Sequence, residues 1–312
     1  MCEASKLVFV AANRFLMYSN LLVELSGSSV FAMNINLVKS KADRLKPKFG
    51  MLTDPIQSVP EEIIRFKKLG FDYAEIGIEE PMATPSILLH QRKRILELLA
   101  LNEMFAIGHT AYWVQFGSAH VKARRGWIEE AKSMIRIASK LKLERLNFHF
   151  YGKLGRVGDT ERSREDFLDY FSSAMSELCK LGSSKRVALM LENVPVGDNG
   201  TGGINNYAHV LERTPQLYCH LDIAHAFIEG GMGRIEAYVK RFSSRLIHIH
   251  IHDNHGELDE HLPLGSANID FKKVVHWLKA IGYDKTVTFE VFTSYRDAVR
   301  SREFFKSLWE KN

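Results

Sequence analysis

Cysteine is scarce in this 312-residue sequence, and long apolar runs are absent. The three cysteines, Cys2, Cys179 and Cys219, lie far apart and form no CxxC pair, which argues against a disulfide framework or a thiolate zinc site. A cytoplasmic location, where thiols stay reduced, fits this usage best. Polar residues break the apolar segments of residues 1–47 before they reach the ~18 residues of a membrane span. We therefore expect no membrane partner, and we interpret residues 1–47 as an N-terminal extension without an assigned function.

The sequence also lacks the glycine-rich motifs that cradle phosphates, since neither GxGxxG nor GxxxxGK[ST] follows the first predicted strand. This absence argues against a nucleotide-binding sheet. The formal net charge of +5 is a mild bias toward phosphorylated or nucleic-acid partners, yet no long run of lysine and arginine accompanies it. The apolar fraction of 46% and the charged fraction of 25% are those of an ordinary globular protein.

From residue 48 onward, short apolar runs alternate with longer amphipathic segments, which is the pattern of repeated βα units. Strands are predicted at 49–52, 73–78, 105–109, 145–150, 187–192, 217–222, 246–252 and 286–291. Helices are predicted at 61–69, 86–101, 125–141, 164–181, 206–212, 234–242, 271–280 and 295–310. Gly70, Gly182 and Gly282 follow three of these helices, where a left-handed residue commonly ends a helix. Eight repeats favour one (β/α)₈ TIM barrel over residues 48–312.

Polar residues stand at or beside the ends of six different predicted strands. They are His109, His149, Glu192, Asp222, His250 and Glu290. Active sites of (β/α)₈ barrels are built at this rim. Imidazole and carboxylate groups without thiolates suit hard or borderline divalent cations, so Mn²⁺, Mg²⁺, Co²⁺ and Zn²⁺ are all admissible. His225, three residues after Asp222, and the pair Asp259 and His261 in the loop after strand seven are further candidate metal ligands.

Once buried, these imidazole and carboxylate groups need hydrogen-bond partners or a bound cation. A lone histidine is most often a surface or hydrogen-bonded core residue, but His248, His250 and His252 alternate along one strand and share the face turned to the barrel interior. Burying several imidazoles costs ~1–3 kcal/mol for each unsatisfied group. Glu192 and Glu290 end apolar strands, where an uncompensated carboxylate would neutralise. A shared cation or a polar network would satisfy both kinds of group.

The strand-end motifs, taken in order, carry a family resemblance over roughly residues 48–310. HTAYWV, NFHFYG, LMLENVP, LDIAHAFIEG, HIHIHDN, DEHLPLG and TFEV resemble the motifs of the xylose-isomerase-like barrels, which include sugar phosphate isomerases and epimerases and endonuclease IV. As in the epimerases, the resemblance implies a metal core of Glu192, Asp222, His250 and Glu290. It implies a metal-dependent isomerase or epimerase that acts on a small sugar or sugar phosphate by proton transfer through an enediolate.

Under this hypothesis the catalytic residues are Glu192, Glu290 and His225. The two metal-bound glutamates would exchange protons on opposite faces of the substrate, and His225 would orient a hydroxyl group. Tyr112 and His252 are assigned to substrate binding.

An alternative implied by the same resemblance is an endonuclease IV-like AP endonuclease, a zinc phosphodiesterase of DNA base-excision repair. Matching that family residue by residue adds five ligands to the core and would complete a set for up to three Zn²⁺ ions. The five are His109, His149, His225, Asp259 and His261. Tyr112 falls where that family places a tyrosine that contacts DNA, so DNA is the partner under this alternative.

Two acidic segments argue against DNA. Glu75, Glu79 and Glu80 in EIGIEEP, and the loop 253–260, would repel a duplex. Lys153 and Arg156 after strand four are candidates for holding a sugar phosphate, although a solvated loop is the more ordinary interpretation. A third alternative is a barrel that binds a ligand without turnover. The exposed faces of the predicted helices leave both a monomer and a homo-oligomer open.

Overall fold

Eight strands and eight helices alternate along the part of the chain that the computed structural model describes, residues 46–152, 160–195 and 203–311. The strands are β1 (Lys48–Leu52), β2 (Tyr73–Ile78), β3 (Phe105–Thr110), β4 (Arg145–His149), β5 (Ala188–Glu192), β6 (Tyr218–Asp222), β7 (Leu246–Ile251) and β8 (Thr286–Phe289). The helices are α3 (Val59–Lys68), α4 (Pro85–Leu101), α5 (Val121–Lys140), α6 (Glu161–Lys185), α7 (Ile204–Arg213), α8 (Ile223–Arg241), α9 (Phe271–Ala280) and α10 (Tyr295–Lys311). These elements belong to one compact unit that begins at Pro47. The predicted extension lies outside the described residues except for its last two positions.

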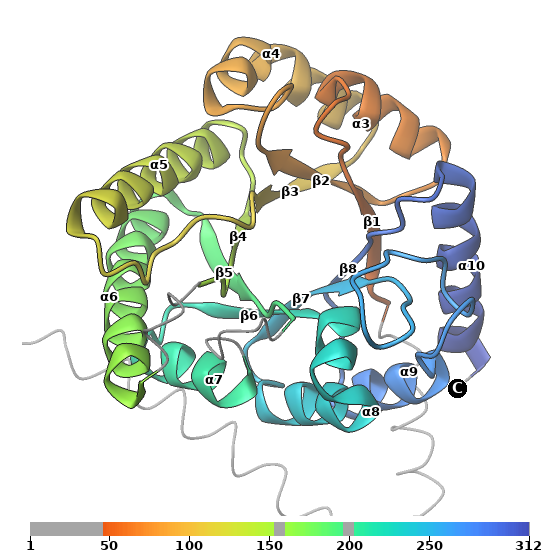
Figure 1. Cartoon of the computed structure of the whole chain (residues 1–312). Helices are drawn as coiled ribbons and strands as arrows, with labels where there is room; N and C mark the ends of the chain where they lie inside the picture. Colours follow the sequence, from red (N-terminus) through yellow and green to blue (C-terminus); the bar gives the residue numbers. More distant parts are fainter. Residues whose placement is uncertain (1–45, 153–159, 196–202, 312) are drawn as a thin grey trace, which may run out of the picture. The chain divides into compact units, whose positions relative to one another are not determined.

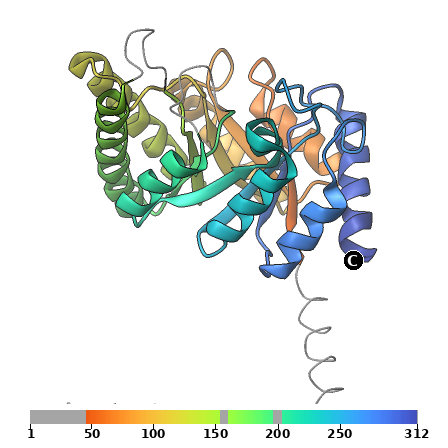
Figure 2. The same ribbon diagram turned by 60° about the horizontal axis from the view of Figure 1, so that its bottom comes forward.

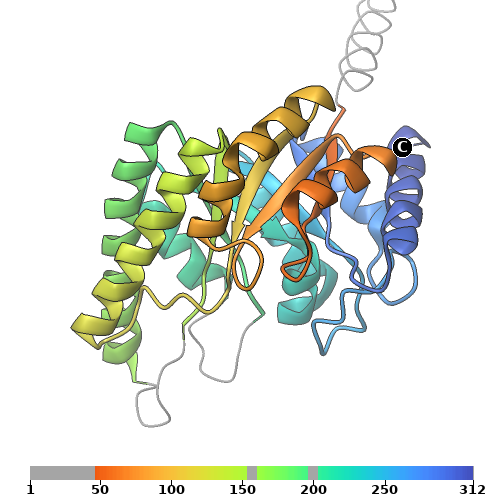
Figure 3. The same ribbon diagram turned by 90° about the horizontal axis from the view of Figure 1, so that it is seen from above.

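The strands close into a barrel in which each strand pairs in parallel with the next, and β8 pairs with β1. The closing register sets Phe49 opposite Val287. Figure 1 looks into the barrel and shows the helices as an outer ring around the strands. Figures 2 and 3 turn the same unit and show these helices running alongside the strands. The prediction of a (β/α)₈ TIM barrel is confirmed.

The barrel interior holds apolar side chains at one level and polar side chains at another. Tyr73, Ile107 and Met190, from the first halves of their strands, form a buried cluster against which Phe105 and Ile247 pack. Farther along the strands, the interior positions of β7 are His248 and His250, both fully buried. Because strand side chains alternate, the apolar residues between them point to the helices. The polar level therefore lies toward the carboxyl ends of the strands.

Two of the three glycines expected at helix ends have the left-handed backbone that this role requires. Gly70 has φ 82° and Gly282 has φ 71°. The prediction for Gly182 is wrong, because α6 continues to Lys185 and ends at Arg186, whose φ is 60°. Gly182 is needed for close packing instead, since a Cβ there would lie 2.7 Å from the carbonyl oxygen of Val187.

The helix after β6 begins far ahead of the predicted range 234–242. Asp222 caps its first turn, because Oδ1 accepts a hydrogen bond of 2.7 Å from the backbone N–H of His225. Gly230 and Gly231 have non-helical φ/ψ values, so α8 is kinked and the periodic pattern predicts only its second half. The bounds of the other elements differ from prediction by a few residues at most. No helix among the described residues has both the length and the apolar character that crossing a membrane requires.

Candidate metal centre

All six polar residues predicted for the barrel rim lie at the carboxyl ends of their strands. His109, His149, Glu192, Asp222 and His250 are on β3, β4, β5, β6 and β7, and Glu290 directly follows β8. Each is at most 7% exposed. The sequence places them there because each ends an apolar strand, and parallel strands of a closed barrel all end at the same rim. The structure therefore brings the predicted ligands to one face of the barrel.

Glu192 lies at the centre of a first group of side chains. Its Oε2 atom is 3.1 Å from Nε2 of His149 and 3.5 Å from Nε2 of His109. Asn147 donates a hydrogen bond of 2.5 Å from its amide to the same oxygen. Burial alone would raise the pKa of the Glu192 carboxyl, but the surrounding imidazoles, His149 first among them, hold it well below its usual range. Nδ1 of His220 lies 3.3 Å from the same Oε2 atom, so Glu192 is ionised and surrounded by several imidazoles.

His250 lies between Glu192 and the second glutamate. Its Nδ1 atom is 3.1 Å from Oε2 of Glu290 and 3.7 Å from Oε1 of Glu192. Burial opposes ionisation of Glu290, yet the neighbouring His250 and His261 outweigh it and lower the pKa of the carboxyl to about 2. Both glutamates thus carry charge at neutral pH and approach one imidazole.

Asp222 and His225 join the strand end to the first turn of α8. His225 Nδ1 lies 2.9 Å from the carbonyl oxygen of Asn193, 3.8 Å from Oδ1 of Asp222 and 3.7 Å from Oε1 of Glu192. The other oxygen of Asp222, Oδ2, lies 3.5 Å from Nε2 of His252. Burial would lower the pKa of His225, but Asp222 and then Asp259 raise it well above its ordinary value. The imidazole of His225 therefore lies between the carboxylates of Asp222 and Glu192.

A third group lies beside the first two. Oδ2 of Asp259 is 3.1 Å from Nε2 of His225 and 3.2 Å from Nε2 of His261. Oδ1 of Asp259 is 3.5 Å from Nε2 of His252, whose ring stacks on His261 with centroids 4.1 Å apart. Burial opposes the positive charge on His261, yet Glu290 and Asp259 raise its pKa to about 9. The segment DEHLPLG thus supplies two side chains to the rim.

The donor atoms of this rim fit a divalent cation. Several of them are buried and have no hydrogen-bond partner within the described residues: both ring nitrogens of His109 and His252, Nδ1 of His149 and Oδ2 of Asp222. Such atoms are costly to leave unpaired. Three sets of three residues each offer ligand atoms that all lie within 4.8 Å of one another: His109, His149, Glu192; Asp222, His225, His252; and His252, Asp259, His261. These histidine and carboxylate groups could hold one or more metal ions.

The structure brings the four-residue core together unevenly. Glu192 and Glu290 each approach His250, whereas His225 lies between Asp222 and Glu192. The nearest imidazole to the free oxygen of Asp222 is that of His252. The choice of His250 as the ligand of this core stays a prediction.

A cavity of about 520 Å³ opens above these residues. Glu192, His225, Glu290 and the ring of Tyr112 are among its walls. Tyr112 is 63% exposed, and its ring meets Tyr151 edge-on at a centroid distance of 5.7 Å. The position of Tyr112 is compatible with the predicted contact to substrate.

His252, the other residue predicted to bind substrate, is fully buried beside Asp222 and Asp259. Lys153 and Arg156 lie outside the described residues.

The assignment of Glu75 to an acidic loop is wrong, because this residue lies on β2 and is fully buried. Its Oε2 atom is 3.0 Å from Nε2 of both His248 and His250. Only Glu79 and Glu80 of that segment follow the strand, and Glu79 lines the cavity. His220 is not among the residues predicted from the sequence, although it precedes Asp222 by two residues and so shares its strand face. Alternation along β2 and β6 is the signal that identifies both.

Comparison with known proteins agrees with this architecture. A sequence model of the family described as "Xylose isomerase-like TIM barrel" matches residues 64–308. The uncharacterized protein MJ1311 of Methanocaldococcus jannaschii is 32% identical over 158 residues, 46% of this chain and 50% of that protein. The chain thus spans about half the length of this relative, and 47% of the uncharacterized protein MJ1614 of the same archaeon. Fructoselysine 3-epimerase of Escherichia coli O157:H7 is 24% identical over 265 residues, 81% of this chain and 93% of that protein.

Solved structures resemble the barrel over most of its length. The crystal structure of a D-tagatose 3-epimerase-like protein has a TM-score of 0.74 and 26% sequence identity, covering 85% of this chain and 97% of that one. An L-ribulose 3-epimerase shares the fold with a TM-score of 0.72 at 18% identity, covering 85% and 95%. Since the family match extends over most of the sequence, the chain belongs to the xylose isomerase-like TIM barrel family.

Proposed function

We propose that the protein is a metal-dependent sugar epimerase that inverts a carbon atom next to a carbonyl group. The observation that carries this proposal is the approach of Glu192 and Glu290 to the same imidazole, His250, at a cavity of about 520 Å³. Two carboxylates so placed can act as base and acid on one substrate. Relatives named as 3-epimerases of fructoselysine and of ribulose support the reaction type.

The residues of the rim have distinct parts in this mechanism. Glu192, Asp222, His250 and Glu290 would hold a divalent ion, which would supply polarisation of the substrate carbonyl. Glu290 removes the proton from the neighbouring carbon and releases it to solvent, and Glu192 takes up a solvent proton and delivers it to the opposite face, so that both carboxylates end ionised as they began. His225 and Asp259 both line the cavity and orient a substrate hydroxyl there, with the ring of His225 held between the carbonyl of Asn193 at Nδ1 and Asp259 at Nε2.

The substrate we propose is a ketose without a phosphate group. A phosphate is usually recognised by arginine, lysine or several backbone N–H groups. Among the described residues, which are 46–152, 160–195 and 203–311, no lysine or arginine lines the cavity. Fructoselysine and ribulose, named for two relatives, are also free of phosphate.

The reaction can be tested by following exchange of the substrate proton with solvent. The protein, supplied with Mn²⁺, Co²⁺ or Zn²⁺, is incubated in D₂O with D-tagatose, L-ribulose, D-allulose or fructoselysine, and deuterium at the carbon next to the carbonyl is measured by NMR. We expect Glu290→Gln to lower exchange at least about 100-fold, the lower end of what a general base contributes. The exposed Glu97→Gln variant is the matched control. Exchange that is unchanged in Glu290→Gln, or absent for every ketose with wild-type protein, contradicts the proposal.

One observation favours the endonuclease IV-like alternative. His225, Asp259 and His261 form a third group of candidate ligands beside the first two, as a three-ion phosphodiesterase would need. Glu79 and the acidic loop 253–260 count against a DNA partner. Three Zn²⁺ ions bound at the rim, together with cleavage of an abasic DNA strand, would support this alternative. Ketose exchange without strand cleavage would support the epimerase.

A further inference from the structure

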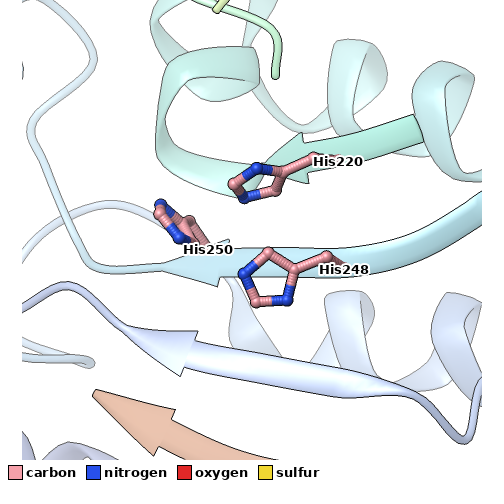
Figure 4. Close-up of side chains that lie close together, drawn as sticks. All are labelled: His220, His248 and His250. Atoms are coloured by element: carbon pink, nitrogen blue, oxygen red, sulfur yellow. The ribbon is translucent and has the colours of Figure 1, made fainter. Parts of the chain in front are cut away.

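Below the rim, three imidazoles meet inside the barrel. His220 of β6 and His248 and His250 of β7 are fully buried. Figure 4 shows their rings turned toward a common space between the two strands. The ring centroid of His220 is 4.4 Å from that of His248 and 4.2 Å from that of His250. One nitrogen atom from each ring lies within 4.8 Å of the other two, so the three rings are close enough to share one ion.

Glu75 brings a carboxylate to the same space from β2. Its Oε2 atom is 3.0 Å from Nε2 of His248 and 3.0 Å from Nε2 of His250. Two ligand atoms that each lie ~2.0–2.2 Å from one ion are separated by about this distance. The second oxygen, Oε1, has no hydrogen-bond partner among the described residues. The carboxylate is therefore placed to share an ion with both imidazoles.

His220 shows that hydrogen bonds alone do not complete this cluster. Neither of its ring nitrogens has a hydrogen-bond partner in the part of the chain that the structure describes. Interior positions of other strands hold residues such as Ile107 and Met190, so an aliphatic side chain is compatible with the barrel interior. Nδ1 of His220 lies 3.3 Å from Oε2 of Glu192, but Nε2 is left unsatisfied unless something binds it.

The Nδ1 atoms of His248 and His250 already have hydrogen-bond partners. Nδ1 of His248 lies 2.8 Å from the hydroxyl of Thr286, and Nδ1 of His250 lies 3.1 Å from Oε2 of Glu290. Metal-bound histidines commonly use their second nitrogen in this way, which fixes the ring and leaves the first nitrogen to the metal. Both rings thus present Nε2 to the space that Glu75 faces.

We propose that Glu75, His220, His248 and His250 form an inner binding site for one divalent cation of the Zn²⁺ type, below the rim and adjoining it. Three imidazole nitrogens and one carboxylate oxygen form a four-ligand set suited to tetrahedral Zn²⁺. His250 belongs to both levels, because Nε2 faces the inner site and Nδ1 faces the rim. Since all four residues are fully buried, the ion enters as the chain folds.

The test counts zinc in protein folded in the presence of the metal. Wild type, His220→Leu and the exposed His276→Leu control are expressed in zinc-supplemented medium, purified without chelators and measured by inductively coupled plasma mass spectrometry. We expect His220→Leu to hold one zinc ion fewer per chain than wild type and the control. Because His220 makes no hydrogen bond to the described residues and the variant loses only its 3.3 Å approach to Glu192, the variant should fold, as circular dichroism will verify. Equal zinc contents in all three proteins would overturn the inner site.

Cobalt supplies a second readout. Protein expressed with Co²⁺ should show the intense visible absorption of four-coordinate Co²⁺ in wild type and in Glu290→Gln, and His220→Leu should lose the part of this absorption that the inner site contributes. Absorption as intense in His220→Leu as in wild type contradicts the proposal. The two proposals fail in different measurements. The epimerase proposal fails if wild-type protein does not exchange the ketose proton with solvent. The inner site fails if the metal content of His220→Leu equals that of wild type.

Discussion

Glu75 carries a negative charge inside the barrel, and three neighbours make that charge tolerable. His248 and His250 approach its Oε2 atom at 3.0 Å, and the hydroxyl of Thr288 donates to the same atom at 2.5 Å. Burial would raise the pKa of the carboxyl, yet the two imidazoles hold it well below its usual range. A buried charge is retained only where such partners replace water. The three groups that meet at this oxygen therefore depend on one another.

Replacing Glu75 by glutamine should destabilise the fold without abolishing it. The amide oxygen can still accept hydrogen bonds in place of Oε2, but it carries no charge, and the amide nitrogen takes the place of Oε1, which has no hydrogen-bond partner among the described residues. We expect the free energy of unfolding, measured by urea denaturation with EDTA present, to fall by about 1–3 kcal/mol. Glu97→Gln on the exposed face of α4 should stay within about 0.5 kcal/mol of wild type. Similar values for the two variants would show that Glu75 is not a partner of the histidines.

The rim residues could be predicted from the sequence, and Glu75 could not be assigned correctly. Glu192 and Asp222 end apolar strands, so the general rule that barrel sites lie at strand ends places them without knowledge of contacts. Glu75 stands inside β2 and meets side chains of β7 and β8 across the barrel. Which residues meet across a barrel depends on the stagger of its strands, and local sequence patterns do not reveal that stagger.

At the scale of secondary structure elements, two helical glycines provide a matched pair. A Cβ at Gly182 in α6 would lie 2.7 Å from the carbonyl oxygen of Val187 and 3.0 Å from a side-chain carbon of Leu189, whereas a Cβ at Gly126 in α5 meets nothing within 4 Å. Gly182→Ala should therefore push α6 away from β5 and lower the free energy of unfolding by about 1–3 kcal/mol. Gly126→Ala should raise it by about 0.5–1 kcal/mol, because alanine favours an exposed helix interior. Urea denaturation of both variants measures the difference, and a stabilised Gly182→Ala would refute the packing argument.

Helix ends illustrate what periodicity predicts and what it misses. The apolar spacing predicts α9 over its full length, 271–280, because both of its ends lie in ordinary turns. It predicts only the second half of α8, where Gly230 and Gly231 break the helical geometry. It also misses the end of α6, since Arg186 takes the left-handed conformation that glycine usually provides. Tertiary packing decides these cases, and a local pattern does not contain it.

At the scale of the whole barrel, the count of repeats predicts the architecture. Eight apolar runs separated by amphipathic segments leave few arrangements other than a closed parallel barrel. That closure turns distant residues into neighbours, since β3, β4, β5, β6, β7 and β8 each bring a polar side chain to one rim. A cation bound there would be held by strands that span more than half of the barrel.

Metal binding at the rim should therefore stabilise the whole barrel. An ion that binds only the folded state adds about 2.7 kcal/mol to the free energy of unfolding at a concentration 100 times its dissociation constant. We expect Zn²⁺, Mn²⁺ or Co²⁺ added to EDTA-treated protein to raise the thermal midpoint, followed by circular dichroism. Asp222→Asn should reduce this rise, because Oδ2 of Asp222 has no hydrogen-bond partner among the described residues and lies 3.5 Å from Nε2 of His252, another candidate ligand. Glu97→Gln should show the full rise, and an unchanged midpoint in wild type with every ion would mean that the clustered carboxylates and imidazoles hold no metal.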